Sequence, residues 1–243
     1  MDRRRPRPSA LPPAANDKIQ AAVHLALLHS IRMAVRSLDS NASARPSARP
    51  SGFAPKLIAG LAGGVSGFAG LAALPIELPI TTTNMLRAIA DIARAEGESL
   101  ASRDTQMACL EVFALGHRGG GLGSEAGYYA LRTMLAKATG DAVRYLLQRG
   151  AAEEAAPVLA RFVGEIAARY GVIVSDRAAA SALPVLGALG GATVNWIFMD
   201  YFQEVARGHF TMRRVERDYG AEPIQECYQE VVRRLALKQN KPC

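Results

Sequence analysis

Glu77 has surroundings that suit acid–base chemistry, because it stands between two Leu-Pro-Ile triplets in the sequence LPIELPI. Burial among such neighbours would disfavour the charged carboxylate and raise its pKa toward a range useful for proton transfer or a buried ion pair. The prolines at positions 75 and 79 also predict a turn, and turns usually lie in water. We favour the solvated turn, so Glu77 is a candidate functional residue and no catalytic residue is assigned.

Three more polar residues accompany apolar stretches: Asn84, Asn195 and Asp200. Either asparagine could cap a helix or join two packed helices through side-chain hydrogen bonds. Asp200, Glu204 and His209 could hold a metal near a helix end, but carboxylates four residues apart are typical of a solvated helix face. No HExxH motif or paired histidine spacing accompanies them, and we predict neither a metal nor another cofactor.

Two glycine-containing motifs resemble sites of known chemistry only superficially. The GGGLG sequence at 119–123 has no GKS or GKT behind it and no predicted strand in front of it, so it predicts a hinge rather than a nucleotide site. The sequence GVSGF around Ser66 does not complete the GxSxG motif of serine hydrolases. Neither motif therefore supports catalysis.

Two long stretches without a charged side chain, 57–75 and 178–199, must position the polar candidates. Each is about as long as the roughly 20 residues that a helix needs to cross a bilayer. Small residues four apart allow helix backbones to approach closely. The stretches also contain several glycines, a terminal proline and polar residues, which favour contact with the membrane surface or burial in a soluble core over full insertion into the bilayer. The glycines predicted to pack helices are Gly60, Gly63, Gly64, Gly67, Gly187 and Gly191.

Composition narrows the class of protein and its partners. With 243 residues and 49% hydrophobic residues, the chain can build a substantial core. The net charge of +7 is partly concentrated in four arginines among the first seven residues, and aromatic residues make up only 6% without interleaving basic stretches, so we predict no nucleic-acid partner. Three distant cysteines and the lack of an apolar segment behind the basic start predict a cytoplasmic protein with reduced thiols.

Periodicity predicts an all-α protein, since no segment alternates with a period of two. Residues 1–55 are expected to form a disordered basic and proline-rich tail, one helix over 17–38 capped by Asn16 or Asp17, and a linker; the main helical domain is expected over 56–243. The helix over 17–38 has an apolar stripe at four-residue steps: Ile19, Val23, Leu27, Ile31 and Val35. We expect a multi-helix bundle with the two glycine-rich helices packed tightly at its centre. Its other predicted helices cover 82–96, with the threonines at 81–83 as a cap, then 104–115, 128–149 and 151–170, the last followed by a turn at Gly171.

The sequences LPIELPITTTNMLRAIADIARAEGE and ALPVLGALGGATVNWIFMDYFQEVARGHFTMRRVERDYG resemble the EcsC protein family over roughly Phe53 to Tyr228. The resemblance implies a helical, bacterial, cytoplasm-facing protein that associates with membrane or transporter components, because the founding member is encoded beside the ATPase and membrane subunits of an ABC transporter. It implies no particular reaction.

Two functional hypotheses follow. The first is a non-enzymatic accessory or interaction protein at the inner membrane, peripheral or partly embedded, whose partners are the membrane surface or transporter subunits. The second is a soluble helical protein that binds an apolar ligand in a pocket or catalyses a reaction with Glu77. The surroundings of the glycine-rich helices separate the hypotheses, because a bare apolar patch favours contact with lipid or a partner.

Overall fold

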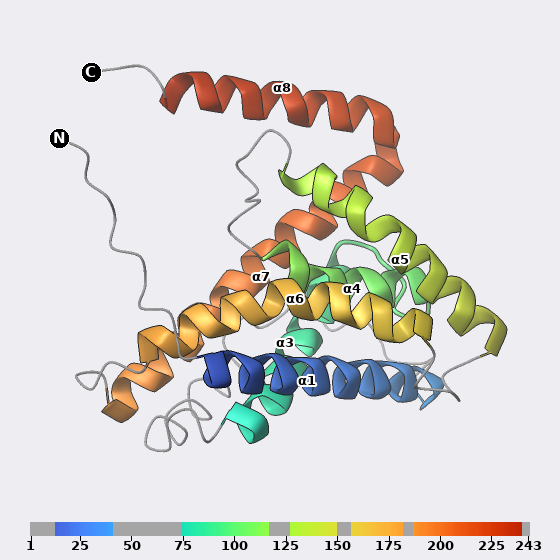
Figure 1. Ribbon diagram of the computed structural model, residues 1–243. Helices are drawn as coiled ribbons and strands as arrows, with labels where there is room; N and C mark the ends of the chain where they lie inside the picture. Colours follow the sequence, from blue (N-terminus) through green and yellow to red (C-terminus); the bar gives the residue numbers. More distant parts are fainter. Residues whose placement is uncertain (1–12, 41–73, 117–126, 150–156, 182–186, 240–243) are drawn as a thin grey trace.

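The computed structural model describes residues 13–40, 74–116, 127–149, 157–181 and 187–239, and all regular structure in these ranges is α-helical (Figure 1). The all-α prediction is therefore confirmed. The predicted glycines Gly60, Gly63, Gly64 and Gly67 lie outside the described residues. The helices are α1 (Pro13–Ser40), α3 (Leu74–Ala95), α4 (Arg103–Leu115), α5 (Gly127–Arg149), α6 (Pro157–Ser181), α7 (Gly187–Tyr219) and α8 (Ala221–Gln239).

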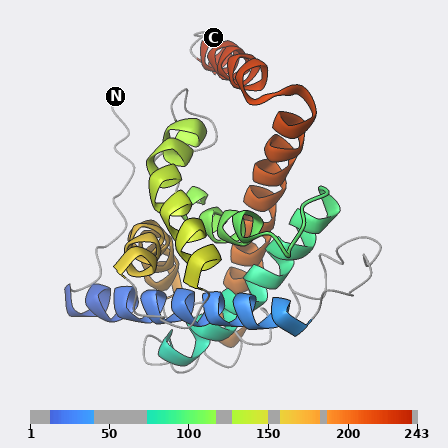
Figure 2. The ribbon, with the colours of Figure 1, turned by 90° about the vertical axis from the view of Figure 1, so that its right-hand side faces the viewer.

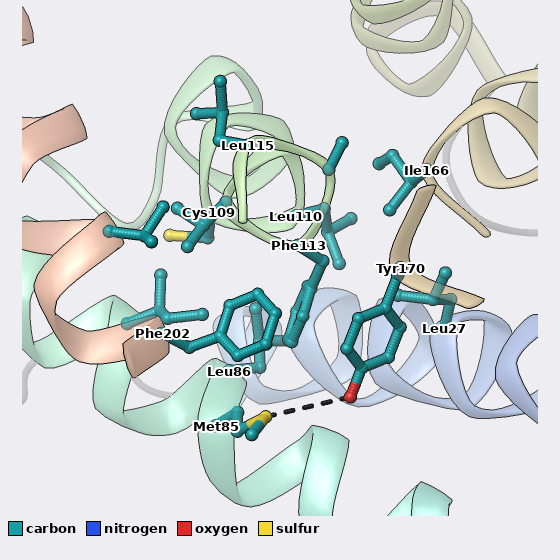
Figure 3. Packing of buried hydrophobic residues seen from close by; sticks show 14 of the residues in the cluster. Leu27, Met85, Leu86, Cys109, Leu110, Phe113, Leu115, Ile166, Tyr170 and Phe202 are labelled. Carbon is teal, nitrogen blue, oxygen red and sulfur yellow. Dashed lines mark hydrogen bonds between the residues drawn. The ribbon is translucent and has the colours of Figure 1, made fainter. Parts of the chain in front are cut away.

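Aromatic side chains from three helices meet in the core (Figure 3). The ring of Phe113 in α4 lies 4.9 Å from that of Tyr170 in α6 and 5.5 Å from that of Phe202 in α7. Phe198, one turn before Phe202, stacks on Tyr170 with ring centroids 6.3 Å apart. Such tilted and offset rings combine large buried areas with favourable ring geometry, so they fix α4, α6 and α7 together.

The first helix, α1, packs against α3 and α6. Ile19, Val23 and Leu27 recur every four residues and are buried, as the predicted stripe requires. The expected cap at Asn16 or Asp17 is wrong, because α1 already begins at Pro13. Proline is compatible with a first helical turn, where its missing N–H group needs no partner.

The second correction concerns α3, which begins at Leu74 rather than near Thr82. The predicted proline-bounded turn around Glu77 is therefore helix, and the threonines at 81–83 lie inside the helix instead of capping it. Pro75 falls in the first turn, where N–H groups have no intrahelical acceptor. Pro79 lies inside the helix, where it has no N–H group to donate to the carbonyl of Pro75, so α3 continues there without that one backbone hydrogen bond.

The third correction concerns α6, which continues through Gly171 to Ser181 instead of turning there. A Cβ atom at Gly171 would overlap the side-chain amide of Gln20 in α1. The glycine thus leaves room for the flexible end of the Gln20 side chain within a continuous helix, and it does not make a turn. The predicted helices at 104–115 and 128–149 agree with α4 and α5 within one residue at each end.

The helices α3 and α7 pack together and run in the same direction. Glu98, just after α3, pairs with Arg213 near the end of α7, whereas Thr82 near the start of α3 contacts Tyr170, which stacks on Phe198 in the first half of α7. In Figure 2 both helices start in the lower part of the view and run upward. Contacts at the two ends of this parallel pair differ sharply in chemistry.

Gly220 joins α7 directly to α8 and has a φ of +91°, a conformation that glycine adopts easily. After this single residue the chain turns sharply, and α8 runs across the top of the molecule in Figure 1. Both views place α8 at the opposite end from α1 (Figures 1 and 2).

Candidate functional site

The predicted polar candidates lie on α3 and α7. Asn84 is half-buried in α3, and Asn195 is fully buried in α7, so neither is a helix cap. Asp200 is half-buried one turn and a half after Asn195. Glu77 lies in the first turn of α3, and its side chain is outside the described part of the structure.

The two helix starts form what we call the charge-free end, defined as residues 78–86 of α3 and 187–199 of α7. Neither stretch contains a charged residue. Gly187 and Gly191 begin α7 within it. Two of its polar side chains, Thr82 and Asn195, are fully buried. The hydroxyl of Thr82 lies 3.3 Å from that of Tyr170 in α6, and the Tyr170 hydroxyl also lies 3.8 Å from the sulfur of Met85 (Figure 3).

Large apolar side chains are nevertheless exposed at this end. Ile80 is 54% exposed and Ile197 is 61% exposed. The pairing of Glu98 with Arg213 sets an offset of 115 residues between α3 and α7, which places Ile80 and Ile197 at nearly the same level of the parallel pair. The two charge-free sequence stretches 57–75 and 178–199 both lead into this end.

The opposite end of the pair is the charged end, formed by three carboxylates and three arginines. Its members are Glu96, Glu98, Asp104, Arg213, Arg214 and Arg217. Gly97, with a φ of +83°, ends α3 in a motif in which the Glu98 N–H donates to the carbonyl of Ala93 at 3.0 Å. This reversal brings Glu98 back against α7.

Glu98 is the centre of the charged end. Its carboxylate accepts from Arg213 Nε at 3.0 Å, from Arg217 Nη1 at 3.2 Å and from the Thr105 hydroxyl at 3.0 Å. Arg213 also donates to Asp104 Oδ2 at 2.7 Å. Burial by itself raises the pKa of Glu98, but the hydrogen bonds and positive charges of Arg213, Thr105 and Arg217 outweigh it and lower the pKa.

A second polar network joins α5 to α7. Arg132 Nη1 donates to Glu216 Oε1 at 2.7 Å and lies 3.4 Å from the hydroxyl oxygen of Tyr128. That hydroxyl lies 3.0 Å from Nδ1 of His209, while Tyr129 donates to Glu216 at 2.8 Å. The network therefore leads from a half-buried ion pair to a fully buried imidazole.

The Tyr128 hydroxyl oxygen contacts both Arg132 and His209. Arg132 can only donate, so the Tyr128 oxygen accepts from it, and the same oxygen can either donate to His209 Nδ1 or accept from it. The other ring nitrogen, Nε2, is buried and has no hydrogen-bond partner in the described structure. Burial lowers the pKa of His209 well below its usual value, and the positive charges of Arg132 and Arg213 lower it further. The imidazole is thus neutral, and with 1% of its surface exposed it is closed to solvent.

The structure does not bring Asp200, Glu204 and His209 together as metal ligands. All three lie in the middle of α7 instead of near a helix end, and Glu204 is exposed and pairs with Arg207 while His209 faces Tyr128. Within the described ranges, no group of three histidine, cysteine or acidic side chains is placed to hold a metal ion. Cys109 is buried, which raises its pKa to about 12, so its thiol stays protonated.

Neither the charged end around Glu98 nor the network of Arg132, Tyr128 and His209 was predicted from the sequence. The residues Tyr128 and Arg132 are four apart and share a helix face, which could have indicated a local pair. Their partners His209 and Glu216 lie more than 80 residues away, and nothing in a single sequence links such positions. The same holds for Glu111, a buried carboxylate in α4 that accepts a hydrogen bond from Thr139 in α5. Burial raises the pKa of Glu111.

None of the helices in the described part of the chain is long and apolar enough to cross a bilayer. No curated protein and no solved structure matches the chain. A sequence profile of the EcsC protein family matches residues 13–215, which includes α1 together with α3 to α6 and most of α7. The chain therefore belongs to the EcsC protein family.

Proposed function

We propose that this protein is a non-enzymatic accessory protein that associates peripherally with the cytoplasmic face of the inner membrane through its charge-free end. One observation carries the proposal: the parallel packing of α3 and α7 brings the uncharged residues 78–86 and 187–199 to one end, where Ile80 and Ile197 remain exposed. Large apolar side chains that remain exposed favour contact with lipid or an apolar protein surface. The family resemblance makes an ABC transporter subunit the alternative occupant of this surface.

The chemistry of the buried networks supports binding over catalysis. His209 and Tyr128 contact each other inside the helical body, and the pKa of His209 is shifted away from the range in which it would exchange protons near neutral pH. Glu98 and Arg213 link two helix ends through ion pairs. These groups stabilise helix packing, while the exposed apolar side chains are available to a partner.

Fractionation of cells that express the untagged protein tests membrane association. We expect the protein in the membrane fraction after a high-salt wash and its release by alkaline carbonate, because apolar contact without a spanning helix resists salt but not carbonate. Recovery in the first soluble fraction would overturn the proposal. Retention through carbonate would replace peripheral contact with insertion.

A pair of substitutions tests which surface makes the contact. Ile80→Glu combined with Ile197→Glu places two charges on the charge-free end and is expected to move the protein to the soluble fraction. Met134→Glu is the matched control, because Met134 is 62% exposed on α5, away from that end. Equal membrane retention of both variants would contradict the assignment of the surface.

Liposomes then separate lipid from a protein partner. If the purified protein floats with vesicles of bacterial phospholipid, lipid alone is sufficient. If membrane retention in cells is lost only when transporter subunits are deleted, the charge-free end binds protein.

A further inference from the structure

In the last helix, α8, the described side chains that contact the body lie along one side. The ring of Tyr228 lies 5.2 Å from that of Tyr129 and 5.9 Å from that of Tyr128 in α5, and Val232, one turn later, is buried. On the neighbouring side of the helix, Val231 is 49% exposed and Leu235 is 52% exposed. Their four-residue spacing places them on one stripe, which begins at the exposed Cys227.

Charges along α8 are divided between its two halves. The first half carries the acidic residues Glu222, Glu226 and Glu230, and the second half carries the basic residues Arg233, Arg234 and Lys238. The helix as a whole has no net charge, but its first half is negative and its second half is positive. A parallel pair of such helices would set like charges side by side, whereas an antiparallel pair sets each acidic half beside a basic half.

We propose that the exposed stripe of α8, Cys227, Val231 and Leu235, binds the same stripe of a second copy of this chain in an antiparallel, two-fold symmetric helix pair. Two-fold symmetry lets one self-complementary surface serve both subunits. Apolar contact between the stripes supplies attraction, and the divided charge sets the antiparallel orientation. In the dimer, the stripe of each copy covers the exposed stripe of the other.

Two features favour a second copy over a lipid surface. Anionic lipid would attract the basic half of α8 but repel its acidic half. The helix also lies past the end of α7, which spans about 50 Å at 1.5 Å per residue, and the charge-free end lies at the start of α7 (Figure 2). The pairing is a property of this chain beyond the family match, since α8 follows residue 215, and it does not rest on the proposed membrane contact.

Analytical ultracentrifugation of the purified full chain over a roughly hundredfold concentration range tests the pairing. We expect a concentration-dependent doubling of mass. Val231→Glu with Leu235→Glu should leave a folded monomer, verified by an unchanged helical circular dichroism spectrum, while Met134→Glu on α5 should still dimerise. A wild-type monomer throughout, or a dimer that survives the double substitution, would overturn the proposal.

Charge exchange tests whether opposite charges set the pairing. Arg233→Glu with Arg234→Glu makes α8 largely acidic, and Glu226→Arg with Glu230→Arg makes it largely basic. Each variant alone should lose most of its dimer, and a mixture of the two should form a one-to-one heterodimer. Failure of the mixture to associate would overturn the role of charge.

Oxidation tests the orientation. In a variant with Cys243→Ser, an antiparallel pair keeps the two Cys227 residues farther apart than the 4.4–6.8 Å Cα separation typical of disulfides. We expect no Cys227 disulfide in the dimer, and its rapid formation would show a parallel pair. Loss of vesicle flotation by the α8 variants without any change in mass would instead assign this face to lipid.

Discussion

The two ends of the α3–α7 pair are held together by opposite kinds of chemistry. At the charged end, Glu98 collects two arginines and a threonine hydroxyl around one carboxylate. At the charge-free end, the hydroxyls of Thr82 and Tyr170 meet among apolar side chains. Ion pairs between half-buried groups join the two helices at one end, whereas uncharged polar groups and apolar packing join them at the other.

This difference separates stability from function within one helix pair. The charged end places its carboxylates and arginines in mutual contact, and Arg217 additionally donates to the carbonyl of Glu96 at 2.9 Å. The charge-free end exposes Ile80 and Ile197. We therefore expect substitutions at the charged end to change the free energy of unfolding, and substitutions of the exposed isoleucines to change membrane association with little loss of stability.

The largest expected effect is that of Glu98→Gln. Loss of the carboxylate charge leaves the half-buried Arg213 paired with Asp104 alone. We expect the free energy of unfolding to fall by about 2–3 kcal/mol. This loss is smaller than that for a fully buried ion pair, because the other partner of Glu98, Arg217, reaches solvent. Urea denaturation followed by circular dichroism measures this loss. Glu230→Gln is the matched control, since Glu230 pairs with Arg233 and Arg234 on an exposed face and its loss should have no measurable effect. An equal loss of unfolding free energy in both variants would mean that Glu98 at the charged end contributes no more than an ordinary surface ion pair.

Acid should weaken the charged end next. The pKa of Glu98 is lower in the folded protein than its usual value of 4.5, so its contribution to stability is complete above pH 4.5 and is lost as the pH falls through the folded pKa. The free energy of unfolding of the wild type should therefore approach that of Glu98→Gln as the pH decreases below 4.5. His209 adds a loss that begins below its usual pKa of 6.5, because the unfolded chain binds a proton that the buried imidazole does not. Both proteins share that loss, and a constant difference between them at all pH values would contradict the role of Glu98.

The sequence predicted the fold class and the helix faces, because periodicity follows directly from burial. The stripe Ile19, Val23 and Leu27 was correct, as were the limits of α4 and α5 within one residue. Errors arose where proline and glycine were interpreted as helix breakers. Pro75 and Pro79 fall at the start of α3, and Gly171 makes room for Gln20, so tertiary packing decided each position.

The functional residues were less predictable than the fold. Asn195 is a polar residue within an apolar stretch, and its burial in α7 excludes the predicted alternative of a helix cap. The charged end requires knowledge that α3 and α7 are parallel, with an offset of 115 residues, which is a long-range fact. Single-sequence patterns describe local faces and cannot supply such an offset.

Thr82→Val tests the hydroxyl contact at the charge-free end. The substitution keeps the branched shape and removes the hydroxyl that lies 3.3 Å from Tyr170, and we expect a loss of about 1 kcal/mol in the free energy of unfolding. A double-mutant cycle with Tyr170→Phe measures the coupling. If the two losses add without coupling, the hydroxyls do not stabilise each other.

Thr81→Val has the smallest expected effect and sharpens the comparison within one turn of α3. The Thr81 hydroxyl oxygen is buried and has no hydrogen-bond partner in the described structure, so its removal relieves an unsatisfied group instead of breaking a contact. We expect the free energy of unfolding to be unchanged or to rise by up to about 1 kcal/mol, opposite in sign to Thr82→Val, although both threonines are almost fully buried. Urea denaturation of the two variants side by side measures the contrast. A loss in Thr81→Val equal to that in Thr82→Val would mean that the Thr81 hydroxyl also has a partner in solution. Thr81 directly follows the exposed Ile80 in α3, so that partner would be sought at the surface that we propose meets the membrane.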